Sequence, residues 1–212
     1  KSASPPLSLI TLSAKSSEAL STYLNHYSTY LQNDKNDQKE VSDIAYSTNL
    51  SQSFFKYRFS TIFSDKHDLI QKLSSAENNH THESSTIKLA SAKTRCRIAF
   101  LFSGQGSQCS GMGKTLYDNF KIFRRVINQC AEYINDELGT DIRSIMWGEN
   151  SELLSKTEYT QPALFIFEYA LCSLWQSWGF KPSIVIGHSI GEYVAACVAG
   201  VMSIEDSLRL VA

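Results

Sequence analysis

The sequence predicts an α/β protein in two parts, a small α+β domain over residues 1–75 and a mainly parallel-sheet domain over residues 97–212. Three observations support this division. The 212 residues are 42% hydrophobic, which is enough apolar content for a core in each part. Apolar runs of strand length alternate with apolar residues at helical spacing. Residues 76–96 are polar and rich in serine, so they predict a connecting segment.

The first part begins with a strand and two helices. Leu7–Leu12 is a short apolar run, typical of a strand. Ser16 is placed to cap a helix, because five apolar side chains follow it at helical spacing. These are Leu20, Tyr23, Leu24, Tyr27 and Leu31. The polar residues Asn33–Glu40 predict a loop, and Ser42 begins a second short helix that reaches Leu50.

A second strand and a third helix complete the first part. Four residues alternate with Arg58, Ser60 and Ile62 and predict a half-buried strand. They are Tyr57, Phe59, Thr61 and Phe63. Ser64 or Asp65 is expected to cap a helix that carries Leu69, Ile70 and Leu73.

The second part opens with the apolar run Ile98–Phe102, which predicts a strand buried on both faces. A stripe of apolar residues from Phe120 to Leu138 predicts a helix with one buried face. Gln161–Trp178 is apolar nearly all round and predicts a buried helix. A second strand at Ser183–Ile186 and helices from Ile190 and from about Ser203 complete the pattern.

Charge and hydropathy exclude several classes of partner. Lys plus Arg is 20 and Asp plus Glu is 21, so a net charge of −1 argues against nucleic-acid or anionic-membrane binding through bulk charge. Lys1–Leu12 lacks the apolar core of a secretory signal. Gln161–Phe180 is the best candidate for a membrane span, but Glu168 in its middle favours a buried core helix. We therefore expect a cytoplasmic protein with no nucleic-acid or membrane partner.

No metal site or disulfide framework is predicted. Two histidines in His80-Thr81-His82-Glu83 lie on a polar segment with no further ligands nearby, so we expect them to be solvated. The five cysteines are odd in number, widely spread and without a C-x-x-C pair, which indicates reduced, intracellular thiols. They are Cys96, Cys109, Cys130, Cys172 and Cys197.

The residues Gly187-His188-Ser189-Ile190-Gly191 form a G-x-S-x-G motif between a predicted strand and a predicted helix. This is the setting of a nucleophile elbow, in which a sharp turn lifts the serine hydroxyl clear of the sheet. The first amide of the following helix, that of Ile190, points toward a developing oxyanion. Neighbouring side chains at a tight turn diverge, so His188 is expected to line the pocket rather than to act as the base.

A second glycine-rich segment, Phe102–Gln108, directly follows the first strand of this part. Such a turn can bring a backbone amide close to a bound carbonyl group. Gly113-Lys114-Thr115 resembles the end of a phosphate-binding P-loop, but that pattern requires glycine where Gln108 stands. Nucleotide hydrolysis is therefore not predicted.

Three motifs in this order resemble the acyltransferase domain of type I polyketide synthases, which is related to malonyl-CoA:acyl-carrier-protein transacylases and has an α/β-hydrolase-like fold. They are Phe-Ser-Gly-Gln-Gly-Ser-Gln-Cys-Ser-Gly-Met-Gly (102–113), Tyr-Thr-Gln-Pro-Ala-Leu-Phe (159–165) and Gly-His-Ser-Ile-Gly-Glu-Tyr-Val-Ala-Ala (187–196). In the first part, three segments resemble the linker domain between ketosynthase and acyltransferase. They are Leu-Ser-Ala-Lys-Ser-Ser-Glu-Ala-Leu (12–20), Asp-Ile-Ala-Tyr-Ser-Thr (43–48) and Phe-Lys-Tyr-Arg-Phe (55–59).

The resemblance implies a role for each matched residue. Ser189 would be the catalytic nucleophile that takes an acyl group from coenzyme A, and the amides of Gln105 and Ile190 would form the oxyanion hole. Gln161 would lie near the active site and bind substrate with His188. The acyl-serine would then pass its group to the phosphopantetheine thiol of an acyl carrier protein. The aliphatic Ile190 after the serine favours malonyl-CoA as the donor, and no cofactor is expected to be bound by the chain itself.

The resemblance also implies residues that the sequence does not contain. The family's carboxylate-binding arginine is expected about 25 residues after the serine, and its catalytic histidine about a hundred residues after it. Both positions lie past Ala212. We therefore expect a fragment of a longer, multifunctional chain, opening after a ketosynthase and ending inside the acyltransferase, with little or no turnover alone.

Two other functions remain open at this point. A serine hydrolase of lipase or patatin type uses the same elbow and would release its acyl group to water. A non-catalytic scaffold would use the first part only to position neighbouring domains.

Overall fold

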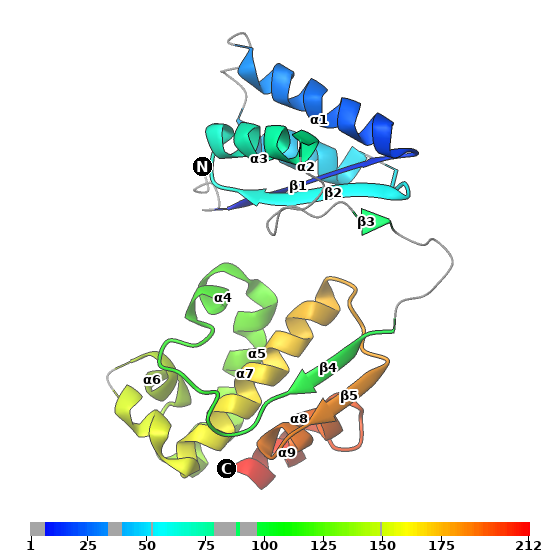
Figure 1. Cartoon of the computed structure of the whole chain (residues 1–212). Coiled ribbons are helices and arrows are strands. Elements are labelled where there is room, and N and C mark those ends of the chain that lie inside the picture. Colours follow the sequence, from blue (N-terminus) through cyan, green and yellow to red (C-terminus); the bar gives the residue numbers. More distant parts are fainter. Residues whose placement is uncertain (1–6, 34–39, 52, 79–87, 90–96, 149) are drawn as a thin grey trace. The chain divides into compact units, whose positions relative to one another are not determined.

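The computed structural model describes residues 7–33, 40–51, 53–78, 88–89, 97–148 and 150–212. The chain forms two compact units, Lys1–Thr94 and Arg95–Ala212 (Figure 1). Each unit has its own cluster of buried apolar side chains, so each is described by itself.

The first unit is an antiparallel sheet covered by helices. The strand order is β1-β2-β3, and β1 pairs with β2 over its whole length, from Ser8 opposite Phe63 to Ala14 opposite Tyr57. Phe59 and Phe63 are buried whereas Ile62 is 53% exposed, which confirms the predicted half-buried strand. The elements are β1 (Ser8–Ala14), α1 (Ser17–Gln32), α2 (Val41–Ser51), β2 (Tyr57–Phe63), α3 (Lys66–Asn78) and β3 (Lys88–Leu89).

Side-chain caps set the start of two of these helices. The Ser16 hydroxyl accepts a hydrogen bond from the amide of Ala19 at 3.1 Å, as predicted. Of the two residues proposed to cap α3, Asp65 is the one whose carboxylate accepts from the amide of Asp68, at 2.9 Å.

Two described stretches of the connecting segment predicted over 76–96 belong to elements of the first unit. Helix α3 continues to Asn78, because Ala76 is buried against the core of this unit. Lys88 and Leu89 form β3, which pairs with Arg58 and Tyr57 of β2. The residues His80–Glu83, considered above as metal ligands, lie outside the described residues.

The second unit contains a parallel pair of strands and a set of helices. Strands β4 (Ala99–Phe102) and β5 (Ile184–Gly187) are in register, with Ala99 opposite Ile184 and Phe102 opposite Gly187. The helices are α4 (Lys114–Asn119), α5 (Lys121–Leu138), α6 (Ile142–Trp147), the 3-10 helix η2 (Ser151–Ser155), α7 (Thr157–Ser177), α8 (Ile190–Val198) and α9 (Ile204–Val211). Helices α4, α6 and η2 were not predicted from the sequence, and each is at most six residues long.

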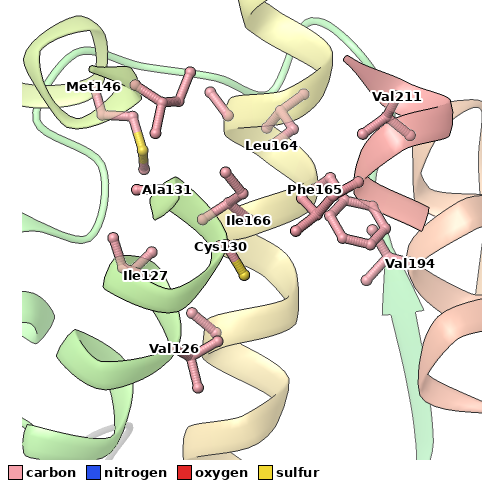
Figure 2. Packing of buried hydrophobic residues seen from close by; sticks show 14 of the residues in the cluster. Val126, Ile127, Cys130, Ala131, Met146, Leu164, Phe165, Ile166, Val194 and Val211 are labelled. Atoms are coloured by element: carbon pink, nitrogen blue, oxygen red, sulfur yellow. The ribbon is translucent and has the colours of Figure 1, made fainter. Parts of the chain in front are cut away.

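Helix α7 is the centre of this unit. Its buried residues meet α5 on one side and α8 and α9 on the other. Figure 2 shows Ile166 toward Cys130 and Ile127 of α5, and Phe165 toward Val194 and Val211 of α8 and α9. The prediction of a buried helix is confirmed, and no helix in the described part of the chain has the length and hydropathy needed to cross a membrane.

The strand prediction at Ile98–Phe102 was partly wrong. Phe102 is buried but Leu101 is 74% exposed, so β4 is not covered on both faces by the described residues. Ile184 and Ile186 of β5 are also more than half exposed. The reason is that helix α8 packs against both strands from one face only.

Candidate active site

Ser189 lies in a strained turn between β5 and α8. Its backbone angles are φ 55° and ψ −123°, and it is the non-glycine residue with a positive φ among those the structure describes. A residue other than glycine adopts this backbone conformation only where the surrounding structure imposes it. The turn leaves Ser189 exposed, and its hydroxyl makes no hydrogen bond with another described residue.

The turn lies against the end of the neighbouring strand. The amide of His188 donates to the carbonyl of Phe102 at 3.1 Å, which extends the β4–β5 ladder by one bond. A Cβ atom on Gly104 would lie 2.6 Å from Nδ1 of His188 and 3.2 Å from Cβ of Ser189. The structure therefore brings together the two glycine-rich segments at 102–108 and 187–191, which are far apart in the sequence.

The Ser189 turn and the loop against it each contain a backbone amide with no acceptor among the described residues. The amides of Gly191 and Glu192 donate to the carbonyls of His188 and Ser189, both at 3.0 Å. The amide of Ile190 is the first of helix α8 and has no acceptor among the described residues. The amide of Gln105, in the loop after β4, also has no acceptor among them. Free amides at a helix start and in an adjacent loop suit a developing negative charge on oxygen.

The side chain of Gln105 connects the loop after β4 to helix α7. Its Nε2 donates to Oγ1 of Thr157 at 3.1 Å. Gln161 follows Thr157 by four residues, so both lie on one face of α7, and Gln161 is half-buried there. This places Gln161 on the helix face that holds the Gln105 loop.

Glu168 also contacts this loop, although it was not predicted as a site residue from the sequence. Its Oε1 accepts hydrogen bonds from the amide of Ser103 at 2.8 Å and from the hydroxyl of Ser103 at 2.5 Å. Its Oε2 is buried and has no hydrogen-bond partner among the described residues. Burial raises the pKa of the Glu168 carboxyl, and the two bonds from Ser103 oppose this rise only in part. The feature of the sequence that could have revealed Glu168 is a carboxylate in the middle of an apolar helix, which was taken only as an argument against a membrane span.

The site contains an exposed serine hydroxyl and backbone amides without acceptors, but no described side chain hydrogen-bonds the hydroxyl as a base would. His188 is exposed at the rim, beside Gly104, and makes no hydrogen bond to the Ser189 hydroxyl. Among the residues that the structure describes, no group of three or more His, Cys, Asp or Glu side chains is arranged to hold a metal ion. The arrangement can accept an acyl group on Ser189 once a base is supplied.

Comparisons with protein families match both units. The family model described as "Acyl transferase domain" matches residues 99–212, more than half of the chain, and the one described as "CurL-like, PKS C-terminal" matches residues 8–73. The chain is 37% identical over 205 residues to a PKS-NRPS hybrid synthetase of Aspergillus niger, with 95% of this chain and 11% of that protein covered. It is 36% identical over 208 residues to orsellinic acid synthase of Armillaria mellea, with 96% of this chain and 9% of that protein covered.

Solved structures show the same fold. The acyl transferase domain of ZmaA superimposes with a TM-score of 0.89 and 33% identity over 100% of this chain and 48% of that one. A malonyl CoA-acyl carrier protein transacylase from Clostridium perfringens matches 55% of this chain and 35% of its own, with a TM-score of 0.50 and 37% identity. The chain thus spans about a tenth of the length of the curated relatives and about half of the solved acyl transferase domain.

The G-x-S-x-G turn, the glycine loop beside it and the matched family model agree on one family. The second unit accounts for the acyl transferase match, and the first unit accounts for the match to a polyketide synthase region. The chain belongs to the acyltransferase domains of polyketide synthases.

Proposed function

We propose that the chain carries the nucleophile of an acyltransferase that moves a malonyl unit from malonyl-CoA to an acyl carrier protein within a longer polyketide synthase. The observation that carries this proposal is the strained Ser189 turn with the Gly104 loop directly against it. A positive φ at a serine is costly, and such strain is characteristic of functional turns.

In the proposed reaction, Oγ of Ser189 attacks the thioester carbonyl as its proton passes to a base. The amides of Ile190 and Gln105 donate to the oxyanion of the tetrahedral intermediate, and the C–S bond then breaks to release the coenzyme A thiol. The phosphopantetheine thiol of the carrier protein attacks the acyl-serine in the same way and regenerates the Ser189 hydroxyl. The acyl group therefore passes from thiol to serine to thiol, with no net redox change.

The proposed reaction also needs a base for the Ser189 hydroxyl and a residue that pairs with the malonyl carboxylate. No described residue hydrogen-bonds the Ser189 hydroxyl, and the family resemblance expects a histidine and an arginine later in the chain than Ala212. We propose that the longer synthase supplies both, which the partial coverage of the relatives supports. Residues 1–212 alone are then expected to show little or no turnover.

Substrate and partner assignments follow from the site and from the resemblance. Gln161 and His188 are proposed to line the substrate pocket, and Ile190 favours malonyl over methylmalonyl units. Residues 1–75 are proposed to be the linker to a ketosynthase of the same parent chain, 76–96 the connection, and 97–212 the acyltransferase part. We propose a cytoplasmic location, because the scattered cysteines indicate reduced, intracellular thiols.

The test is intact-mass spectrometry after mixing with malonyl-CoA or methylmalonyl-CoA. It compares the complete acyltransferase domain, residues 1–212, and the complete domain with Ser189→Ala. A malonyl adduct on the complete wild-type domain only, followed by transfer to a carrier protein, is the expected result. Release of free malonate without transfer would indicate a hydrolase, and no adduct with any acyl-CoA would indicate a scaffold.

A further inference from the structure

The loop Ser103–Ser107, which presents the Gln105 amide, has few attachments of its own. Within the loop, the Ser107 hydroxyl donates to the carbonyl of Gly104 at 3.0 Å and lies 2.8 Å from the hydroxyl of Ser103. The amide of Gly106 donates to Oε1 of Gln108 at 2.7 Å. Most of the loop residues are exposed, so burial does not hold the loop in one conformation.

Two side chains of helix α7 hold this loop from outside. Thr157 accepts from the side chain of Gln105, and Glu168 accepts from both the amide and the hydroxyl of Ser103. Thr157 and Glu168 are eleven residues apart, about three turns, so they lie on the same face of α7. The loop is therefore attached to one helix at its first residue, Ser103, and at its middle residue, Gln105.

The attachment at Ser103 requires a buried carboxyl group, which costs free energy and is not needed to fill the space. Glu168 is only 7% exposed, and its neighbours in α7, Phe167 and Leu171, are apolar. One of its oxygens accepts two hydrogen bonds, but the other has no partner in the described part of the chain. A leucine here would fill the same space in an apolar helix without burying a carboxyl group. Buried polar groups that break the local pattern in this way are concentrated at functional sites.

We infer that Glu168 is a positioning residue for acyl transfer, which holds Ser103 so that the Gln105 amide stays aimed at the oxyanion beside Ser189. The inference rests on the proposed function, because it gives the Gln105 amide its role. Glu168 touches neither substrate nor nucleophile and acts through two hydrogen bonds to Ser103. What it contributes is an acceptor at Oε1, so an amide oxygen in the same place can do the same work.

The test measures the rate of Ser189 acylation in the complete acyltransferase domain by rapid quench and intact mass. Loss of one oxyanion donor slows catalysis by about 10²–10³-fold, so a loosened donor is expected to slow it by about tenfold or more. Glu168→Met, which keeps the volume and removes the acceptor, should show this drop in the maximal rate. The malonyl-CoA concentration at half-maximal rate should change by less than about twofold, because the oxyanion forms only in the transition state. Glu168→Gln should stay within about threefold of the wild type.

Thr160→Val is the matched control. Thr160 is fully buried in the same helix, and its hydroxyl donates to the carbonyls of Leu154 and Lys156, away from the loop. The Thr160→Val variant should lose stability like Glu168→Met but should acylate Ser189 at the wild-type rate per folded molecule.

If Glu168→Met does not fold, Ser103→Ala replaces it, because Ser103 is exposed and its amide can still donate to Glu168. About a threefold drop in the rate of Ser189 acylation is expected for Ser103→Ala.

The outcomes distinguish failure of the Glu168 inference from failure of the proposed acyltransferase function. If the wild-type domain is not acylated at Ser189, the proposed function fails. If the wild type is acylated and Glu168→Met or Ser103→Ala matches it per folded molecule, the function stands and the inference fails. Equal losses in Glu168→Gln and Glu168→Met would also overturn it, since the charge rather than the acceptor would then matter.

Discussion

Gly191, in the first turn of α8, lies directly against Phe102, the last residue of β4. A Cβ atom on Gly191 would be 2.5 Å from the carbonyl oxygen of Phe102 and 2.6 Å from that of Ser103. Real Cβ atoms do not approach backbone oxygens this closely, so only glycine allows helix α8 to start here. This contact explains why the Ser189 turn and the Ser103 loop share one edge of the sheet.

Gly191→Ala is expected to destabilise the second unit by about 3 kcal/mol or more, because the clash is with backbone atoms that cannot rotate away. Gly139→Ala is the control, since Gly139 ends α5 with φ 66° and open space around it. It should cost about 1 kcal/mol, from the left-handed backbone alone. Urea unfolding followed by tryptophan fluorescence measures both, because all three tryptophans lie in the second unit. A smaller loss at Gly191 than at Gly139 would contradict the close approach.

The strain at Ser189 predicts that glycine is tolerated better than alanine at this position. Ser189→Gly should be more stable than Ser189→Ala by about 1 kcal/mol, because relief of the strained backbone outweighs the flexibility of glycine in the unfolded chain. At Ala196, within helix α8, the change to glycine should instead cost about 1 kcal/mol. Urea midpoints of the three variants test this, and a less stable Ser189→Gly than Ser189→Ala would show that the turn carries no strain.

The pH dependence of stability should reveal the buried carboxyl of Glu168. Burial raises its pKa above the ordinary 4.5, so the folded chain holds this proton more tightly than the unfolded chain does. Between pH 4.5 and the raised pKa, the free energy of unfolding of the wild type should therefore fall as the pH rises. Glu168→Gln lacks this proton, so the stability of the wild type relative to the variant should decline over this window and then level off.

Other titrating groups do not disturb the comparison. Hydrogen bonds from Lys72 and from the amide of Ser64 lower the pKa of Asp68, and the Arg143 side chain lowers that of Asp141. These carboxylates stabilise the folded state as the pH rises, but equally in both proteins. Urea midpoints at half-unit steps from pH 4.5 to 8 are the measurement. Parallel curves for the wild type and Glu168→Gln would show that the pKa of Glu168 is not raised.

The described cysteines should differ sharply in their reactivity. Cys109 is exposed, whereas burial raises the pKa of Cys130 to about 12 and that of Cys172 to about 11, and it raises the pKa of Cys197 as well. Because the thiolate is the reactive form, Cys109 should react with iodoacetamide at pH near 8 in minutes. The three buried thiols should react at comparable rates only in denaturant. Peptide mass mapping follows each cysteine separately, and rapid native labelling of Cys130 would contradict the packing between α5 and α7.

Local patterns predicted most of the longer elements correctly. Apolar periodicity located α1 and α5, and alternation located β2, because each pattern reports which side of one element faces the core. Helix α7 was located by a run that is apolar nearly all round. Ser16, Asp65 and Ser203 mark helix starts because a side chain three residues before an amide can accept its bond. The short helices α4 and α6 were missed, since six residues give too little periodicity to detect.

The sequence by itself determined the α/β class, the Ser189 turn and the family resemblance, because each depends on residues that are neighbours in the chain. Only the tertiary structure decided which groups meet. The contact of Glu168 with Ser103 joins positions 65 residues apart, and the contact of Gln105 with Thr157 joins positions 52 apart. The tertiary structure also decided that Leu101 is exposed, although its strand is apolar throughout. Such pairings follow from how whole helices pack on the sheet, and no local pattern carries that information.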